Sequence, residues 1–286
     1  MNKTVRYILY FVILAICIMA VFIGVYNMEL AKAEKESEIL NNQTEVSIIN
    51  ETETTADKFI DLFSNDFFSS NYNESKISKL YTDRPLVFAE SQNTEKDGQY
   101  KIDAYLPIIN INSETAIKYN NDTIANFGER AKTLMNSPTT KGYTIYDTSF
   151  TGYINNNILS VAIMGSIKEG NNAQRVLIKS YNYNLDTGKE VPISEVLSQK
   201  GIDPTLVNNK IKTEIKEAIE HAEIVSQTGY EVYKRNTDDE MYDVKNVNNY
   251  IIGPEGIIYI VYAYGNTNNT SEMDVIEVGY EANQNN

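Results

Sequence analysis

Residues 157–197, NILSVAIMGSIKEGNNAQRVLIKSYNYNLDTGKEVPISEVL, decide how this chain folds. Apolar and polar side chains alternate at the start of the stretch, which is the period-two pattern of a half-buried strand. Gly170-Asn171-Asn172 can take positive φ and close a hairpin, and the residues that follow return as a second strand rich in β-branched and aromatic side chains. A tight turn at Asp186-Thr187-Gly188 leads to a short third strand, and then Ser194 is the predicted N-cap of a brief helix that ends near Gly201. The stretch contains no catalytic pattern, so it predicts a topology and not an activity.

Strands and helices are predicted along the rest of the chain as well. Further strands are expected at residues 100–109, 142–154, 249–252, 257–264 and 273–280. Pro107 should end regular pairing in the first of them. A short helix is predicted at residues 58–68, and long helices should begin at Ser113 and at Asp203-Pro204. The long helices should turn two sets of side chains inward: Ile117, Ile124, Phe127, Ala131 and Leu134, and then Val207, Ile211, Ile215, Ala218 and Ala222.

The order of these elements predicts the fold class. Strands linked mostly by hairpins, with two long helices between them, are typical of an α+β protein with a largely antiparallel sheet. We expect this body at residues 76–286, with two sub-lobes at about 76–140 and 141–286. Residues 29–75 are expected to form a polar stalk followed by the short helix.

Residues 7–26, YILYFVILAICIMAVFIGVY, form an uninterrupted apolar run. Twenty helical residues span about 30 Å, the thickness of the hydrocarbon core of a bilayer. Lys3 and Arg6 precede the run and acidic residues follow it from Glu29 onward. The positive-inside bias therefore predicts a transmembrane signal anchor at residues 1–28, with the N-terminus in the cytoplasm and the body outside a single-pass cell membrane protein.

Two other interpretations of this segment are open. Ala31-Lys32-Ala33 could serve as the cleavage site of a signal peptide, although the apolar run exceeds the usual length of one. A lipoprotein signal ending at Cys17 is disfavoured, because bulky Ile16 stands where a small residue is expected. About six residues precede the apolar run, too few for a folded cytoplasmic domain.

Composition excludes several classes of function. The net charge is −14, and since Lys3 and Arg6 contribute +2 ahead of Glu29, the remainder carries −16. Such an acidic body repels nucleic acid and attracts basic proteins or cations. Cys17 is the single cysteine, so the body can hold no disulfide, no thiolate zinc site and no cysteine nucleophile. The 21 tyrosines and 9 phenylalanines are typical of a packed globular body.

No catalytic residue and no cofactor are predicted. His221 is the single histidine, and it lies off the apolar face of its helix, as a solvated surface residue would. A metal-dependent deacetylase needs several histidine and aspartate ligands, and no glycine-rich phosphate loop follows a strand. Acidic residues are plentiful, so a carboxylate pair that cleaves glycans is an alternative, but the sequence singles out no pair.

The densest acidic group is the predicted binding site. Asp238, Asp239, Glu240 and Asp243 lie in the loop NTDDEMYD. They could bind a basic partner or a cation, or they could form a solvated loop. The spacing lacks the glycine and the terminal glutamate of a calcium-binding loop, so no metal site is predicted. Tyrosines recur at period two at Tyr181 and Tyr183 and at Tyr262 and Tyr264, where sheet packing is favoured over a sugar-stacking platform.

Two segments carry a resemblance to a known family. YNYNLDTGKEVPISEVL (181–197) and YIIGPEGIIYIVYAYG (250–265), in this order of elements, resemble the extracellular domain family shared by RsiV-type lysozyme-sensing anti-sigma factors and the N-terminal region of some peptidoglycan deacetylases. The resemblance covers roughly residues 100–280. It departs from the family at Glu169–Gln174, where members often carry a Gly-Gly-Ala-His-like turn and this chain has no histidine. The chain also lacks the cytoplasmic sigma-binding segment and the downstream catalytic domain, so neither activity carries over.

What the resemblance implies is an anchored, outward-facing module. We therefore expect a non-enzymatic, membrane-anchored extracytoplasmic binding or sensor module of a bacterial cell envelope. Its partner would be a basic protein such as lysozyme, or the cell-wall glycan, peptidoglycan. The alternatives are a cell-wall-modifying enzyme that uses carboxylates and a structural subunit of a membrane complex.

Overall fold

The computed structural model describes residues 54–69, 72, 76–136, 142–226, 233–265 and 272–279 of this chain of 286 residues. The predicted membrane anchor and most of the predicted stalk lie outside these ranges. None of the helices that the structure describes is both long enough and apolar enough to cross a bilayer.

The larger sheet has six strands and is built around the hairpin of residues 158–184. Its strand order is β2 (Val87–Lys96), β3 (Tyr100–Ile109), β4 (Thr144–Asn155), β5 (Ile158–Glu169) and β6 (Arg175–Asn184), and β1 (Asp66–Phe68) also pairs with β4. Strands β5 and β6 are antiparallel from the pair Ile158↔Asn184 to the pair Ile167↔Arg175. Gly170 closes this hairpin with φ 52°, so the prediction for the central hairpin is confirmed.

Two strands of this sheet were not predicted, and two pairings are parallel. Strand β2 is an edge strand that is mostly polar, and β1 is three residues long, so neither carries a strong pattern. Strand β4 pairs in parallel with β3 and with β1. The helix predicted at residues 58–68 is wrong beyond Ile60, where α2 (Thr55–Ile60) ends. Asn65, at φ 59°, exchanges hydrogen bonds with the Phe150 backbone, which directs the chain into β1.

Pro107 does not end the pairing of β3, contrary to the prediction. It lies opposite Ala89 of β2, and the ladder continues to Ile109. The N–H groups of Tyr105 and Ile109 point away from β2, since they donate to Thr148 Oγ1 and Asn120 Oδ1. Backbone direction alternates along a strand, so the nitrogen of Pro107 also lies on the side away from β2. Because β3 pairs with β4 only as far as Ala104, the proline removes no hydrogen bond of the ladder.

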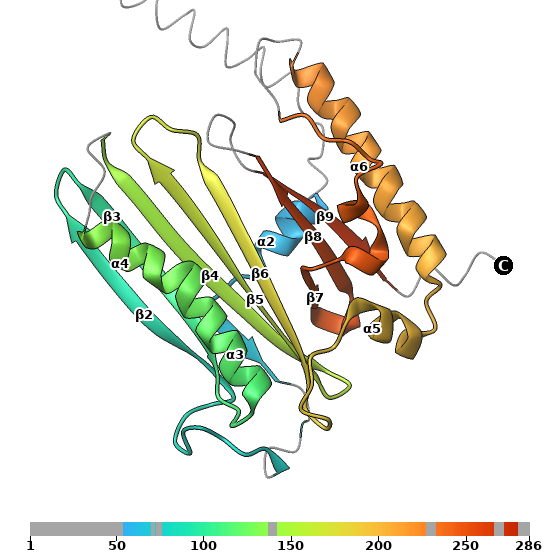
Figure 1. Ribbon diagram of the computed structural model, residues 1–286, viewed down its shortest axis with the longest axis horizontal. Coiled ribbons are helices and arrows are strands. Elements are labelled where there is room, and N and C mark those ends of the chain that lie inside the picture. The colour runs from blue at the N-terminus through green and yellow to red at the C-terminus, as the bar shows by residue number, and fades with distance from the viewer. Residues whose placement is uncertain are drawn as a thin grey trace, which may run out of the picture. The chain divides into compact units, whose positions relative to one another are not determined.

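One helical segment covers a face of the larger sheet (Figure 1). It comprises α3 (Glu114–Thr123), a π-helical turn (Ile124–Gly128) and α4 (Glu129–Asn136). Ser113 caps its start, as predicted, by accepting a hydrogen bond from Ala116 N–H. Ile117 is exposed, contrary to the prediction, because Asn120 and Thr123 take the inward positions. Both are satisfied there by hydrogen bonds, which an apolar pattern cannot reveal.

The smaller sheet is antiparallel and consists of β7 (Tyr250–Ile252), β8 (Ile258–Tyr264) and β9 (Glu272–Val278). Helices α5 (Ile193–Lys200) and α6 (Pro204–Ser226) cover one of its faces (Figure 1). Phe59 of α2 is buried against the other face.

Two helix starts of this region differ in outcome. Pro192, not Ser194, is the N-cap of α5, so that prediction is wrong by two residues, while Gly201 caps its end at φ 67° as predicted. Asp203 accepts a hydrogen bond from Thr205 N–H at the start of α6, as predicted. The structure is thus α+β with mostly antiparallel sheets, which confirms the predicted class.

Candidate functional site

The two sheets meet at β7, which lies beside β6 without a backbone ladder. Side chains make the connection: Tyr250 N–H donates to Ser180 Oγ over 2.9 Å, and Ile252 N–H donates to Ser160 Oγ over 3.2 Å. Asn182 Nδ2 donates to the Tyr250 carbonyl over 2.9 Å, and its Oδ1 accepts from Ser160 Oγ over 2.6 Å. Ser160 and Asn182 are buried, so this polar junction holds β7 in place in the interior.

Beyond this junction the outer edge of β6 is open. The backbone groups of even-numbered residues point away from β5 there, since Ser180 N–H donates to Asn249 Oδ1 and Asn182 O accepts from Val191 N–H. Because backbone direction alternates along a strand, the N–H and C=O groups of Val176 and Ile178 point the same way. In the part of the chain that the structure describes, no strand pairs with them.

Strand β8 has a matching open segment. Val261 N–H donates to Asn249 O over 3.0 Å on the side of β7. Strand β7 extends no further in this direction, so the next backbone groups on this side, those of Ala263, have no strand partner among the described residues. Two open strand edges, one from each sheet, therefore lie on either side of one space.

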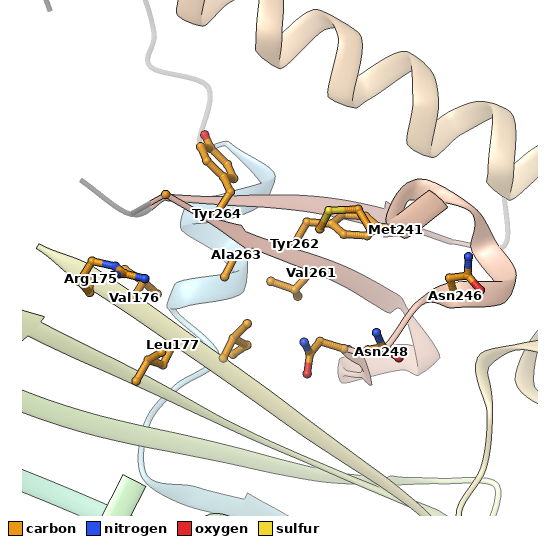
Figure 2. Close-up of a pocket in the computed structure, with 13 residues that line it drawn as sticks. Arg175, Val176, Leu177, Met241, Asn246, Asn248, Val261, Tyr262, Ala263 and Tyr264 are labelled. Carbon is orange, nitrogen blue, oxygen red and sulfur yellow. The ribbon is translucent and has the colours of Figure 1, made fainter. Parts of the chain in front are cut away.

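That space is a groove of about 310 Å³ (Figure 2). Its walls come from β6, β8 and the segment that leads into β7. The lining residues are Arg175, Val176, Leu177, Ile178, Met241, Asn246, Asn248, Asn249, Val261, Tyr262, Ala263, Tyr264 and Gly265. Arg175 lies toward one end of the groove, and Met241 and Asn246 lie toward the other (Figure 2).

Tyr262 is one of the residues that line this groove, and its side chain extends into the core of the smaller sheet. Its side chain is buried, and the hydroxyl has no hydrogen-bond partner among the described residues. Burial raises the pKa of the Tyr262 hydroxyl, and the nearby Tyr242 and Asp243 raise it further. The hydroxyl stays protonated but has no exposed surface, since the ring packs on Tyr242 in the core between the smaller sheet and α6.

A buried ion pair fixes the segment that precedes the acidic group. The guanidinium of Arg235 bonds the Asp274 carboxylate, and the two side chains are 3% and 8% exposed. The guanidinium carbon lies 3.9 Å from the ring centroid of Tyr264, and Tyr233 stacks on the same ring. Burial raises the pKa of Asp274, and the Arg235 charge opposes that rise. The ion pair and the ring contacts together hold residues 233–235 against Tyr264 of β8 and Asp274 of β9.

The predicted acidic site lies next to the groove, at its Met241 end. Asp238, Asp239 and Glu240 are exposed, and Asp239 Oδ1 accepts from Met241 N–H, which caps a short 3-10 turn. Asp243, by contrast, forms ion pairs: its Oδ1 lies 3.5 Å from Lys212 Nζ, and its Oδ2 lies 3.9 Å from Lys245 Nζ. Within the described ranges, no three acidic, histidine or cysteine side chains are arranged to hold a metal ion.

A second hollow lies on the larger sheet, where Ile60 of α2 and Met273 of β9 also line it. It has a volume of about 390 Å³ and contains Asp103 and Asp147, which lie directly opposite each other on β3 and β4. Burial raises the pKa of Asp147, the Asp103 charge adds to the rise, and Lys101 opposes it. Asp147 is exposed, whereas Asp103 is half-buried and its Oδ1 is buried without a hydrogen-bond partner among the described residues.

The other residues that the sequence singled out lie elsewhere. His221 is exposed on α6, away from both hollows. Tyr181 and Tyr183 are buried in the core of the larger sheet, as the sheet-packing interpretation predicted. The groove-lining residues of β6 were not predicted, because an open strand edge depends on which strands meet in space.

Comparison with known proteins finds similar solved structures, among them two DUF3298 family proteins. No family model matches the chain, and neither does any curated protein. A DUF3298 family protein from Pseudomonas aeruginosa PAO1 is similar over 70% of this chain and 93% of its own, at 7% identity and a TM-score of 0.39. A member of the same family from Bacteroides fragilis NCTC 9343 is similar over 68% and 90%, at 11% identity and a TM-score of 0.34. The link to anti-sigma factors or deacetylases therefore stays a prediction.

Proposed function

We propose that this chain is a binding module that takes an extended segment of a basic protein into the groove as an added strand. The unpaired edge of β6 at Val176 and Ile178 is the observation that carries the proposal. An extended peptide that adds to such an edge gains main-chain hydrogen bonds, and its alternate side chains are read by the walls. Ala263 of β8 offers a second set of backbone groups across the groove.

Charge favours a basic partner. The chain beyond Lys3 and Arg6 carries a net charge of −16, and Asp238, Asp239 and Glu240 have no ion-pair partner among the described residues. A surface of one sign speeds the encounter with a partner of the opposite sign and disfavours acidic partners.

A synthetic peptide tests the proposal. A peptide of about eight residues that alternates lysine with valine should bind the purified full-length protein in detergent micelles, with a dissociation constant of about 1–100 μM in fluorescence anisotropy. The same peptide with glutamate in place of lysine should bind at least about tenfold more weakly. No binding of the lysine peptide at millimolar concentration, or equal binding of the two, would contradict the proposal.

Two kinds of partner are expected in the cell envelope: a basic protein such as lysozyme, and the glycan of purified peptidoglycan. We propose the protein partner over the glycan, because the groove offers free strand edges and its tyrosines stand at the wall and not on an open platform. Co-sedimentation with peptidoglycan that the lysine peptide does not compete would overturn this choice.

We also propose that the module is anchored by residues 7–26 with the groove outside the cell membrane. The apolar run and the positive residues before it support this orientation. Protease added to intact cells should then degrade the groove-bearing body. A body that resists protease on intact cells and is degraded after lysis would contradict the orientation.

A further inference from the structure

We infer that the hollow of about 390 Å³ on the larger sheet is a binding site for a primary alkylammonium ion, a positively charged amine with a short aliphatic chain. The inference does not rest on the proposed function, since Val176 is the one residue among those described that lines both the hollow and the groove. The volume of the hollow falls within the range of about 300–1,000 Å³ that is typical of small-molecule sites.

A single row of side chains crosses the floor of the hollow from β3 to β6. Each member of the row lies directly opposite the next in the sheet register, and all of them line the hollow: Asp103, Asp147, Ser166 and Val176. Directly opposite residues project from the same face of a sheet. The floor therefore changes from two carboxylates, through a hydroxyl, to an aliphatic side chain.

Three more apolar side chains line the same hollow. Met164 lies two residues before Ser166 on β5, so it projects from the same face, and Ile60 of α2 and Met273 of β9 come from outside the larger sheet. Ile60 is 43% exposed, although α2 packs on the smaller sheet through Phe59. An aliphatic chain bound in the hollow would remove this apolar surface from water, which is favourable.

The carboxylate end of the hollow lacks hydrogen-bond donors. Asp103 Oδ1 is buried without a partner, and neither Asp103 nor Asp147 forms an ion pair within the described ranges. Lys101, two residues from Asp103 on the same strand, only partly offsets burial and the Asp103 charge, so the pKa of Asp147 stays raised. Two carboxylates that repel each other and lack donors are stabilised by a cation bound between them.

An alkylammonium ion matches both ends of the hollow. Its nitrogen carries three donors and no acceptor, so it can meet both carboxylates at once. Ser166 Oγ accepts from Gln174 Nε2 over 2.7 Å and keeps a second lone pair for the third donor. The aliphatic chain then lies toward Val176 and Met164. A neutral alcohol would leave the carboxylate charges uncompensated, and a bare inorganic cation would leave the apolar walls without a partner.

Small amines and their analogues test the site. n-Butylamine is protonated at pH 7, as a lysine side chain is. It should bind the purified full-length protein in detergent micelles at least about fivefold more tightly than butanol, which lacks the charge, or methylamine, which lacks the chain. Ligand-observed NMR titrations measure the three affinities, with empty micelles as background. Equal affinity of butylamine and either analogue, or no binding of butylamine at about 50 mM, would overturn the site.

Variants of the protein assign the binding to the carboxylate pair. Asp103→Asn and Asp147→Asn should each weaken butylamine binding by about tenfold and leave butanol binding unchanged. Each substitution keeps the side-chain volume and removes one of two repelling charges, so folding is preserved. The matched control is Asp97→Asn, an exposed acid on the turn between β2 and β3, which should bind butylamine as the unmodified protein does. An equal loss in this control would overturn the site.

The lysine–valine peptide identifies the source of the ammonium group. If Asp147→Asn weakens the binding of butylamine and not of the peptide, the site takes a free amine. If it weakens both, the site also takes the lysine side chain of a protein. Butylamine binding that neither Asp147→Asn nor Asp103→Asn changes would overturn the site, whatever the peptide does in the groove.

Discussion

Replacing Arg235 by alanine should lower the free energy of unfolding by about 3–5 kcal/mol. The substitution leaves the Asp274 carboxylate, 8% exposed, without its charged partner in the interior. It also removes the cation from the face of the Tyr264 ring. The expected result is a lower urea midpoint with an unchanged dependence of the free energy on urea, measured by tyrosine fluorescence.

Two comparisons isolate the cause. Lys132→Ala breaks an ion pair with Glu129 of 2.7 Å, but both side chains are more than half exposed, so its cost should be about 0–1 kcal/mol. The double substitution Arg235→Met with Asp274→Leu should recover most of the loss, because no unpaired charge is left buried. An Arg235→Ala cost no larger than that of Lys132→Ala would show that the buried Arg235–Asp274 pair does not stabilise the fold.

The second large effect is expected at the junction between the sheets. Asn182→Ala should lower the free energy of unfolding by about 3 kcal/mol, because it removes the donor to the Tyr250 carbonyl and the acceptor of the Ser160 O–H in the interior. Asn126→Ala, which removes an exposed side-chain bond to the Asp122 carbonyl, should cost under about 1 kcal/mol.

Hydrogen exchange locates the damage from Asn182→Ala. The amides of Tyr250 and Ile252 donate to side chains of this junction, so they should lose protection before the amides of the β4–β5 ladder. Uniform loss of protection, or a free-energy change equal to that of Asn126→Ala, would contradict the role of the junction.

Much of the fold could be predicted because local chemistry and tertiary structure agree there. Gly170, Gly201 and Pro204 occupy positions that their backbone preferences favour, and the structure keeps them at a hairpin, a helix end and a helix start. Strand β8 is apolar on both faces because α5 and α6 cover one side of its sheet, and α2 with side chains of the larger sheet covers the other. At these positions the local sequence is enough to predict the backbone conformation or the burial.

Two of the incorrect predictions share one physical cause, which is that a polar side chain is satisfied by a partner elsewhere in the fold. Asn120 occupies an inward helical position because the Ile109 backbone satisfies its amide. Asn65 ends the first helical segment through its bonds to Phe150. Neither pairing leaves a periodic signal in the sequence, since the partners are far apart along the chain.

The candidate site could be predicted only in part. The acidic group from Asp238 to Asp243 stands out in the sequence, and it lies beside the groove. The open edge of β6 does not stand out, because Val176 and Ile178 have the side chains of an ordinary strand. What makes them a candidate site is that β7 ends before it reaches them, which is a property of the assembled sheets.

The central claim is strand addition to β6, and one substitution tests it most directly. Proline at position 176 removes the N–H that points into the groove and takes nothing from the ladder with β5, as an edge position allows. The lysine–valine peptide should bind Val176→Pro at least about tenfold more weakly than Val176→Ala, which loses a similar side chain but keeps the N–H. Equal affinity of the two variants, both folded by circular dichroism, would contradict strand addition at this edge.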